Sequence, residues 1–202
     1  EAGLPTYIDK PFACSLSDGR QLADLATVNQ VPIFSSSSLR YAPEVVSALQ
    51  KADQIGDFVG VSVSTPASRH PRNPGLFHYG IHGVEMLYTL LGTGCRTVWS
   101  VSNEDVDLVT GLWQDGRVGT VRGIRRGKAD FGFTIYGQKQ VLRSTVSTAF
   151  IYRELLKQIV EMFTTGQSPL QITETLEIIA FIEAANTSAR SGGTSISLAK
   201  IN

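Results

Sequence analysis

Apolar residues recur at two different spacings along the chain, and the change of spacing divides it into two parts. Up to about residue 50, short apolar runs alternate with segments of helical period, whereas after Gly56 apolar and polar residues alternate at every second position. A period of 3.6 residues is typical of an amphipathic helix, and a period of two is typical of a half-buried strand. We therefore expect an α/β part followed by a part built on a sheet.

The first part predicts a strand, a helix and a second strand. β-Branched and aromatic residues fill positions 6–9, and the run "VPIFSSSS" predicts another strand that leads into a polar loop. Between them, Ser15 and Asp18 form a capping box for a helix that reaches about Val28. Strand–helix–strand order is typical of a parallel βαβ unit.

The second part predicts an open antiparallel sheet with helices on one side. Pro43 suits the first turn of a helix to about Lys51. Alternation then runs through "DFVGVSVST", "RTVWSVS", "DVDLVTGLWQD", "GRVGTVRGIRR" and "DFGFTIYG", and turn sequences such as "QDGR" and "YGQK" accompany these segments. They predict about five antiparallel strands with one polar face. Two helices follow near 150–164 and 172–189, and "TSISL" supplies a last short strand.

Composition and charge exclude several classes of function. Eighteen basic side chains balance eighteen acidic ones in the 202 residues, so the chain lacks the cationic excess of a nucleic-acid-binding protein. No apolar run reaches the roughly 18 residues that a membrane span requires. Cys14 and Cys95 are interpreted as small buried hydrophobic residues of a reducing compartment, and we expect a cytoplasmic protein, with export of a longer parent left open. The opening "EAGLPTYIDKP" resembles the end of a helix followed by a strand, which predicts that the chain is a fragment.

All three histidines gather between residues 70 and 82, beside an apolar helix that we expect over 81–91, before Gly92. His82 lies in the first turn of this helix and Glu85 follows three positions later. A carboxylate at that spacing can position an imidazole and favour its charged form. Because imidazole titrates near neutrality, His82 is a candidate acceptor for the proton of a hydroxyl group.

Two other interpretations of the histidines stay open at this point. His82 could be a hydrogen-bonded structural histidine at a helix start. His78 and His82 could also bind a metal through their i, i+4 spacing, but Gly80 lies between them and no third ligand is evident, so we predict no metal site. His70 is interpreted as a loop residue.

Lys10 and Arg40 are the candidate cations. Lys10 follows the first predicted strand in the sequence "DKP", and ligands of open parallel sheets bind beyond the carboxyl ends of the strands. Its amine could hold a substrate hydroxyl, or it could be a solvated lysine paired with Asp9. Arg40 lies at the junction of the two parts, where it could bind an anionic or hydroxylated group or form a structural salt bridge.

Three segments together resemble the Gfo/Idh/MocA family, the glucose–fructose oxidoreductase and inositol dehydrogenase group. "GLPTYIDKPFACSLSDGRQLADLA" is similar to the family's strand, EKP motif and following helix, with Asp9 in place of the usual Glu. "LFHYGIHGVEMLYTLLG" is similar to its D-x-G-x-H segment and helix, and "SPLQITETLEIIAFIEAANTSARSGGTSISL" to its closing helix and strand. The resemblance extends over essentially the whole chain.

The resemblance implies a fold class of α/β plus α+β. Residues 1–40 would be the C-terminal remnant of a Rossmann dinucleotide-binding domain, a parallel βαβ unit. Residues 41–202 would be an α+β substrate-binding and oligomerisation domain, an open and mostly antiparallel sheet with helices packed on one face. The sheet would join the subunits of a homodimer or homotetramer.

The resemblance also implies the site. The parent protein would be an NAD- or NADP-dependent oxidoreductase acting on a sugar, a polyol or a related hydroxylated molecule. Lys10 and His82 would be catalytic, with Lys10 holding the hydroxyl and His82 accepting its proton. Asp9, Lys10 and Pro11 would contact the cofactor, and the Lys10–Pro11 peptide bond would be cis. The remaining substrate-binding candidates are Arg40, His78, Tyr79 and Glu85.

The chain departs from the family pattern in two ways. The family's Asp four positions before the catalytic His falls on His78, which cannot stabilise a charged imidazole as a carboxylate does. No strand followed by G-x-G-x-x-G and a helix occurs in the chain, so we expect these residues alone to bind the cofactor poorly. The alternative function is a non-catalytic sugar-binding or oligomerisation module built on the same fold.

Overall fold

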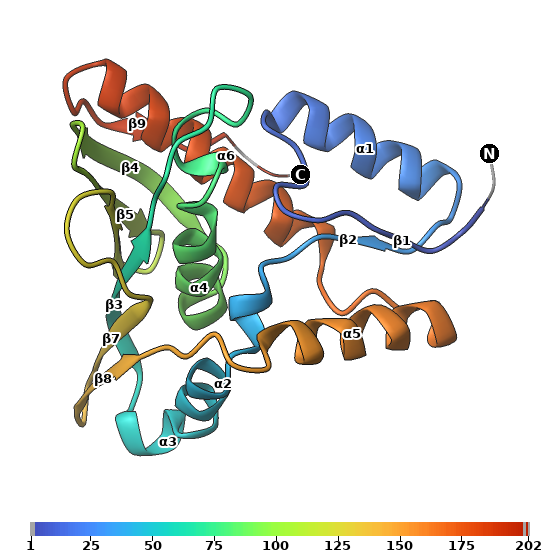
Figure 1. The fold of residues 1–202 in the computed structure, drawn as a ribbon, viewed down its shortest axis with the longest axis horizontal. Coiled ribbons are helices and arrows are strands. Elements are labelled where there is room, and N and C mark those ends of the chain that lie inside the picture. Colours follow the sequence, from blue (N-terminus) through green and yellow to red (C-terminus); the bar gives the residue numbers. More distant parts are fainter. Residues whose placement is uncertain (1–2, 200, 202) are drawn as a thin grey trace.

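The computed structural model describes residues 3–199 and 201. The helix end expected at residues 1–2 lies outside this part. Figure 1 shows a small parallel strand pair and a large sheet, with helices between and around them. No helix among the described residues is long and apolar enough to cross a membrane.

The predicted βαβ unit is confirmed. Strands β1 (Thr6–Tyr7) and β2 (Ile33–Phe34) pair in parallel, and helix α1 (Leu16–Val28) connects them. The Ser15 side chain accepts a hydrogen bond from the backbone N–H of Asp18, as the capping sequence predicts. Both strands are shorter than expected.

The large sheet has seven strands in the order β8-β7-β3-β6-β5-β4-β9. The strands are β3 (Phe58–Pro66), β4 (Cys95–Ser102), β5 (Val106–Trp113), β6 (Val118–Ile124), β7 (Gly132–Gly137), β8 (Val141–Thr145) and β9 (Ile196–Ser197). The expectation of five antiparallel strands is corrected in two respects. Strand β8 was not predicted, and β3 pairs with β6 in parallel. After β3 the chain reaches β4 through a helix, and the β4–β5–β6 meander then returns to β3.

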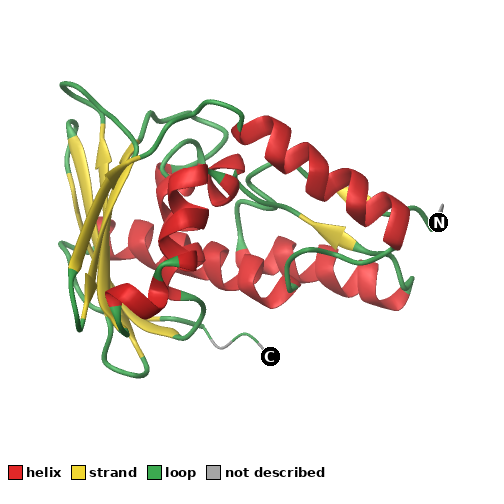
Figure 2. Ribbon diagram, turned by 90° about the horizontal axis from the view of Figure 1, so that it is seen from below, coloured by secondary structure: helices red, strands yellow, loops and turns green. Residues whose placement is uncertain are grey.

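Helices cover one face of the large sheet, as Figure 2 shows. The longer helices are α2 (Pro43–Gln50), α4 (Ile81–Leu91), α5 (Ile151–Thr165) and α6 (Ile172–Arg190), and the short ones are η1 (Ser38–Tyr41), α3 (Ala52–Ile55) and η2 (Gly75–Phe77). The predicted helices near 43–51, 81–91, 150–164 and 172–189 are thus confirmed. Gly92, with φ 72°, ends α4 as expected.

Helix α4 lies directly on the sheet and is buried almost all round. A Cβ atom at Gly83 would come within 2.5 Å of Thr65 Cγ2 on β3, so glycine is needed for this approach. Ten of its eleven residues are buried, His82 and Glu85 among them. The polar side chains of His82 and Glu85 on this helix are therefore enclosed by the protein.

The outer face of the sheet is mixed rather than polar, which corrects the expectation. Serine, threonine and arginine side chains lie there beside large apolar ones. The partly exposed apolar residues of its strands include Val59, Trp99, Val101, Leu108, Val118, Tyr136 and Val141.

The two predicted parts share one hydrophobic core. Phe12 and Leu16 belong to the same cluster as residues of α6 and of the sheet. A Cβ atom at Gly19 of α1 would lie 3.0 Å from Ile179 Cδ1 of α6, so these helices are in close contact. The βαβ unit is consequently held against the sheet part by side-chain packing.

Candidate functional site

His82 lies at the start of α4 and is only 7% exposed. Its Nδ1 atom is 2.6 Å from the hydroxyl oxygen of Ser37, in the loop before η1. Two aromatic rings meet the imidazole at steep angles. The centroid of Tyr79 lies 4.8 Å away and that of Phe131 lies 6.0 Å away. These contacts hold the ring in one orientation.

Lys10 approaches the same place from the end of β1. Its Nζ atom donates a hydrogen bond to the carbonyl oxygen of His78 at 3.2 Å and lies 5.3 Å from the centroid of the Tyr79 ring. Burial lowers the pKa of Lys10, and nearby Asp9 partly offsets this effect. The structure therefore brings Lys10 and His82, seventy-two positions apart in sequence, against one tyrosine ring.

The charge state expected for His82 is wrong. Burial lowers its pKa from 6.5 to about 3, and the positive charges of Lys10 and His78 act in the same direction. Glu85 does not counteract them, because its carboxylate is bound to Arg40. The spacing along the helix could not show that Arg40 would bind the carboxylate of Glu85.

Arg40 lies at the centre of a buried ion cluster. Its Nη2 atom is 3.0 Å from Glu85 Oε2 and 2.6 Å from Glu174 Oε1. Burial raises the pKa of Glu85 and Arg40 opposes this shift. Burial likewise disfavours the charged guanidinium, yet the two carboxylates together raise the pKa of Arg40. This geometry favours the structural salt bridge over substrate binding for Arg40 and Glu85.

His78 stands in a more open environment than His82. It follows η2 and stacks on His70, with ring centroids 5.1 Å apart. It therefore precedes α4 and does not share a regular helical turn with His82. Within the described part of the chain, no group of three or more His, Cys, Asp or Glu side chains is arranged to hold a metal ion.

The carboxyl ends of β1 and β2 form a polar edge. The Tyr7 hydroxyl donates to Asp9 Oδ1 and contacts the carbonyl oxygen of Ser36, both at 3.3 Å. Burial and the charge of Asp9 raise the pKa of Tyr7. The hydroxyl groups of Ser36 and Tyr41 are buried and lie near each other, and neither has another hydrogen-bond partner among the described residues. The Lys10–Pro11 peptide bond at this edge is cis, as the resemblance implies.

Two residues of the site were missed at the sequence level. Ser37 belongs to a run of four serines that predicts only a polar loop, yet it is completely buried against His82. Phe131 packs on both Tyr79 and His82. The available signal for Ser37 was the position of the serine run directly after a predicted strand.

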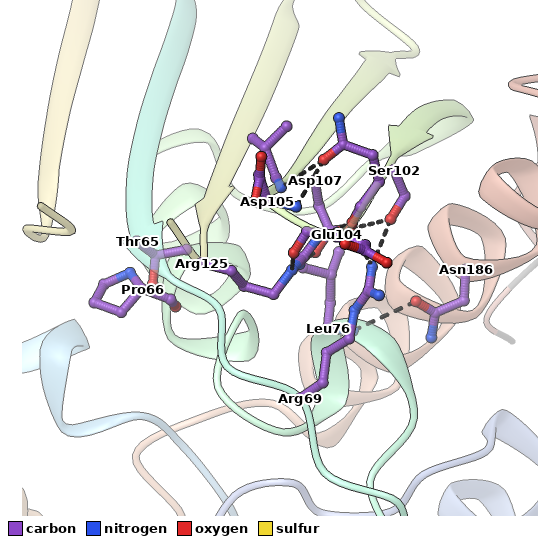
Figure 3. Close-up of polar contacts among 12 residues, drawn as sticks. Thr65, Pro66, Arg69, Leu76, Ser102, Glu104, Asp105, Asp107, Arg125 and Asn186 are labelled. Carbon is purple, nitrogen blue, oxygen red and sulfur yellow. Dashed lines mark hydrogen bonds and ion pairs between the residues drawn. The ribbon is translucent and has the colours of Figure 1, made fainter. Parts of the chain in front are cut away.

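A second ion cluster lies at one end of the large sheet (Figure 3). Asp107 of β5 binds Arg125 and Arg69 and accepts a hydrogen bond from Ser102. The side chain of Arg125 is only 10% exposed. The nearby Arg126 and Lys128 are highly exposed.

No protein-family model and no curated protein sequence matches the chain. Several solved structures share its architecture. GenD2 from gentamicin A biosynthesis, in complex with NAD, superposes with a TM-score of 0.86 at 19% sequence identity, over 98% of this chain and 73% of that chain. The chain has the Gfo/Idh/MocA fold.

Inositol dehydrogenases show the same likeness. Myo-inositol 2-dehydrogenase from Lactobacillus plantarum gives a TM-score of 0.85 at 12% identity, over 98% of this chain and 74% of that one. Myo-inositol dehydrogenase from Lactobacillus casei, in complex with NAD(H) and myo-inositol, gives a TM-score of 0.81 at 14% identity, over 97% of this chain and 71% of that one. At these identities the likeness shows the Gfo/Idh/MocA fold, and the chain spans about three quarters of the length of these dehydrogenases.

Proposed function

We propose that the chain is the C-terminal portion of an NAD- or NADP-dependent oxidoreductase that acts on a hydroxyl group of a sugar, a polyol or a related small molecule. The observation that carries this proposal is the meeting of Lys10 and His82 at the ring of Tyr79. An amine and an imidazole at one point can contact one substrate oxygen from two sides. The fold is shared with GenD2, solved in complex with NAD, and with a myo-inositol dehydrogenase solved in complex with NAD(H) and myo-inositol.

The polar edge at β1 and β2 fits the nicotinamide end of such a cofactor. Ligands of open parallel sheets bind at this edge, where Asp9 and Lys10 follow β1 and the buried Ser36 follows β2. When bound, the nicotinamide ring would supply the acceptor for the hydride of the substrate carbon. The phosphate-binding sequence G-x-G-x-x-G is absent from the chain, so we propose that these residues alone bind the cofactor weakly.

Lys10 and His82 would act on the substrate oxygen. The amino group of Lys10 would exchange its contact with the His78 carbonyl for a hydrogen bond to the substrate hydroxyl. His82 would reach the same oxygen through Nε2, because Ser37 occupies Nδ1. Tyr79 and Phe131 would exclude water from this point. His78 would line the open side of the site.

Activity of the full-length protein that contains the chain tests the proposal. We expect saturable NAD(H) or NADP(H) binding and a change in nicotinamide absorbance that requires a polyol such as myo-inositol. His82→Ala should lower turnover by roughly 10²–10⁴-fold without abolishing cofactor binding. Lys10→Ala should weaken both turnover and substrate affinity. Lys128→Ala is the matched control, since that lysine is highly exposed on the loop after β6.

Two outcomes would contradict this function. Absence of nucleotide binding at millimolar cofactor would favour the non-catalytic sugar-binding or oligomerisation module. Unchanged turnover in His82→Ala would remove His82 from the reaction.

We also propose that the outer face of the sheet joins subunits of a homodimer or homotetramer. Val101 is 66% exposed on this face, and Trp99 and Leu108 accompany it. Apolar area of this kind is typical of subunit interfaces. Leu108→Glu should reduce the mass measured by light scattering, whereas Val28→Glu on the exposed side of α1 should leave it unchanged.

A further inference from the structure

Ser37 makes two hydrogen bonds that together define the direction in which its hydroxyl hydrogen points. The side chain is completely buried. Its oxygen accepts a hydrogen bond from the backbone N–H of Leu39 at 3.1 Å, which caps η1. The same oxygen lies 2.6 Å from His82 Nδ1. A serine hydroxyl has a single hydrogen to donate, and Nδ1 is the acceptor that the described contacts of Ser37 provide.

The opposite arrangement of protons is unfavourable. If His82 carried its hydrogen on Nδ1 and donated it to Ser37, the hydroxyl hydrogen of Ser37 would be left without an acceptor inside the protein. A buried donor without a partner loses its hydration and gains nothing in return. The structure therefore favours donation from Ser37 to Nδ1.

The imidazole is also held in its neutral form. It is enclosed by Tyr79 and Phe131 and is only 7% exposed, and burial disfavours its charged form. A neutral imidazole carries one hydrogen, on one of its two nitrogens. With Nδ1 accepting from Ser37, that hydrogen resides on Nε2.

We propose that Ser37 is a positioning residue that fixes His82 as the neutral tautomer with its hydrogen on Nε2, so that His82 offers a hydrogen-bond donor to the substrate oxygen. The catalytic role of this tautomer rests on the proposed function, whereas the tautomer itself can be measured on the chain without any activity. His82 would then stabilise negative charge on the oxygen and would not remove its proton.

The proton of the hydroxyl would consequently go to Lys10. During oxidation the O–H bond would break and an N–H bond would form on the uncharged amine of Lys10, and a bound nicotinamide would supply the acceptor for the hydride that the same carbon loses as it becomes a carbonyl. Burial lowers the pKa of Lys10, which favours the uncharged amine that this step needs. The roles expected from the family resemblance are thereby exchanged between the two residues.

Nitrogen-15 NMR of histidine-labelled chain tests the proposal without reference to activity. The chain has three histidines, so His70→Asn and His78→Asn assign the signals of His82. We expect the Nε2 signal of His82 to show a directly bonded hydrogen at pH 7 and the Nδ1 signal to show none. A directly bonded hydrogen on Nδ1 of the unmodified chain would overturn the proposal, whatever the variants do.

Three serine variants sharpen the test. Ser37→Ala should move His82 toward a mixture of the two tautomers, and Ser37→Thr should restore the original spectrum because it keeps the hydroxyl. Ser38→Ala is the matched control, because this neighbouring serine is also buried. A His82 spectrum unchanged by Ser37→Ala would overturn the role of Ser37.

Kinetics of the full-length protein separate this inference from the proposed function. Ser37→Ala should lower kcat and leave the Kd of the cofactor unchanged. If the full-length protein shows no cofactor-dependent oxidation, the proposed function fails while the NMR result still stands. If it is active and His82 carries hydrogen on Nδ1, the inference fails and the function stands.

Discussion

The two ion clusters of the molecule contain the same kinds of charge in opposite proportion. At α4, one arginine, Arg40, forms ion pairs with two carboxylates, those of Glu85 and Glu174. At the end of the sheet, one carboxylate, that of Asp107, forms ion pairs with two arginines, Arg69 and Arg125 (Figure 3). Each places a deeply buried charge at the centre.

The clusters differ in what else their members can bind. Arg40 and Glu85 are 8% and 3% exposed and come from η1 and α4, so they depend on each other. Arg125 also donates to the backbone carbonyl groups of Asn103 and Glu104, and Arg69 is 46% exposed. The sheet-end cluster therefore keeps partners when one member is lost. In the α4 cluster, loss of Glu85 still leaves Arg40 with Glu174, but loss of Arg40 leaves Glu85 without a counter-ion. Burial and alternative partners, not the number of ion pairs, decide how much a pair contributes.

Arg40→Leu should have the largest effect on stability. It leaves Glu85 buried without a counter-ion, which we expect to cost about 3–5 kcal/mol. Urea unfolding followed by circular dichroism measures this loss through the midpoint. In the double variant Arg40→Leu/Glu85→Leu the loss should be smaller, because no unpaired charge remains in the most buried position. A loss below about 1 kcal/mol in the single variant would contradict the comparison.

The second-largest effect should be the pH dependence of stability that the buried His82 contributes. Its pKa is about 3 in the folded chain and near 6.5 when unfolded, so the unfolded chain binds a proton first as the pH falls. The stabilisation is therefore complete above pH 6.5 and is lost between 6.5 and about 3. Between pH 6.5 and pH 4 the unmodified chain should lose about 3 kcal/mol more of its free energy of unfolding than the His82→Gln variant does.

Urea unfolding at several pH values measures this difference. His78→Gln is the matched control, since this histidine lies in a more open position and should retain the steep dependence. Parallel pH profiles for the unmodified chain and His82→Gln would show that His82 is not buried in its neutral form.

Asp107→Asn should have a smaller effect than Arg40→Leu. Arg125 keeps its hydrogen bonds to backbone carbonyl groups, so we expect a loss of about 1–3 kcal/mol. The same urea experiment applies. A loss as large as that of Arg40→Leu would show that the two clusters do not differ as described.

Arg69→Met should have the smallest effect. The arginine is nearly half exposed and its pair with Asp107 is partly screened by water. We expect a change below about 1 kcal/mol, which raised salt should reduce further. A salt-insensitive loss above this value would mean that Arg69 acts through packing.

The sequence predicted α4 to its terminal residues, and the reason is local. A helical period from Ile81 to Leu91 is followed by Gly92, whose positive φ ends the helix. The burial of His82 and Glu85 on that helix was not predicted. A period shows which side of a helix is polar, but the neighbours of that side, η1 and α6, come from distant parts of the chain.

The sheet shows the same limit. Alternation identified most of its strands, since side chains of a strand point to opposite faces in turn. It carries no information on direction, so the parallel pairing of β3 with β6 was missed. Strand β8 was missed because its short, partly charged sequence "VLRST" has little alternation of apolar residues.

The sequence by itself determined the order of most helices and strands, the βαβ unit and the candidates Lys10 and His82, because periods, caps and motifs are local properties. Only the tertiary structure placed Lys10 and His82 on one tyrosine ring, gave Glu85 to Arg40, and put the hydroxyl of Ser37 against the imidazole. Those contacts join residues dozens of positions apart. Their charge states and hydrogen positions depend on burial, which arises only when the elements pack.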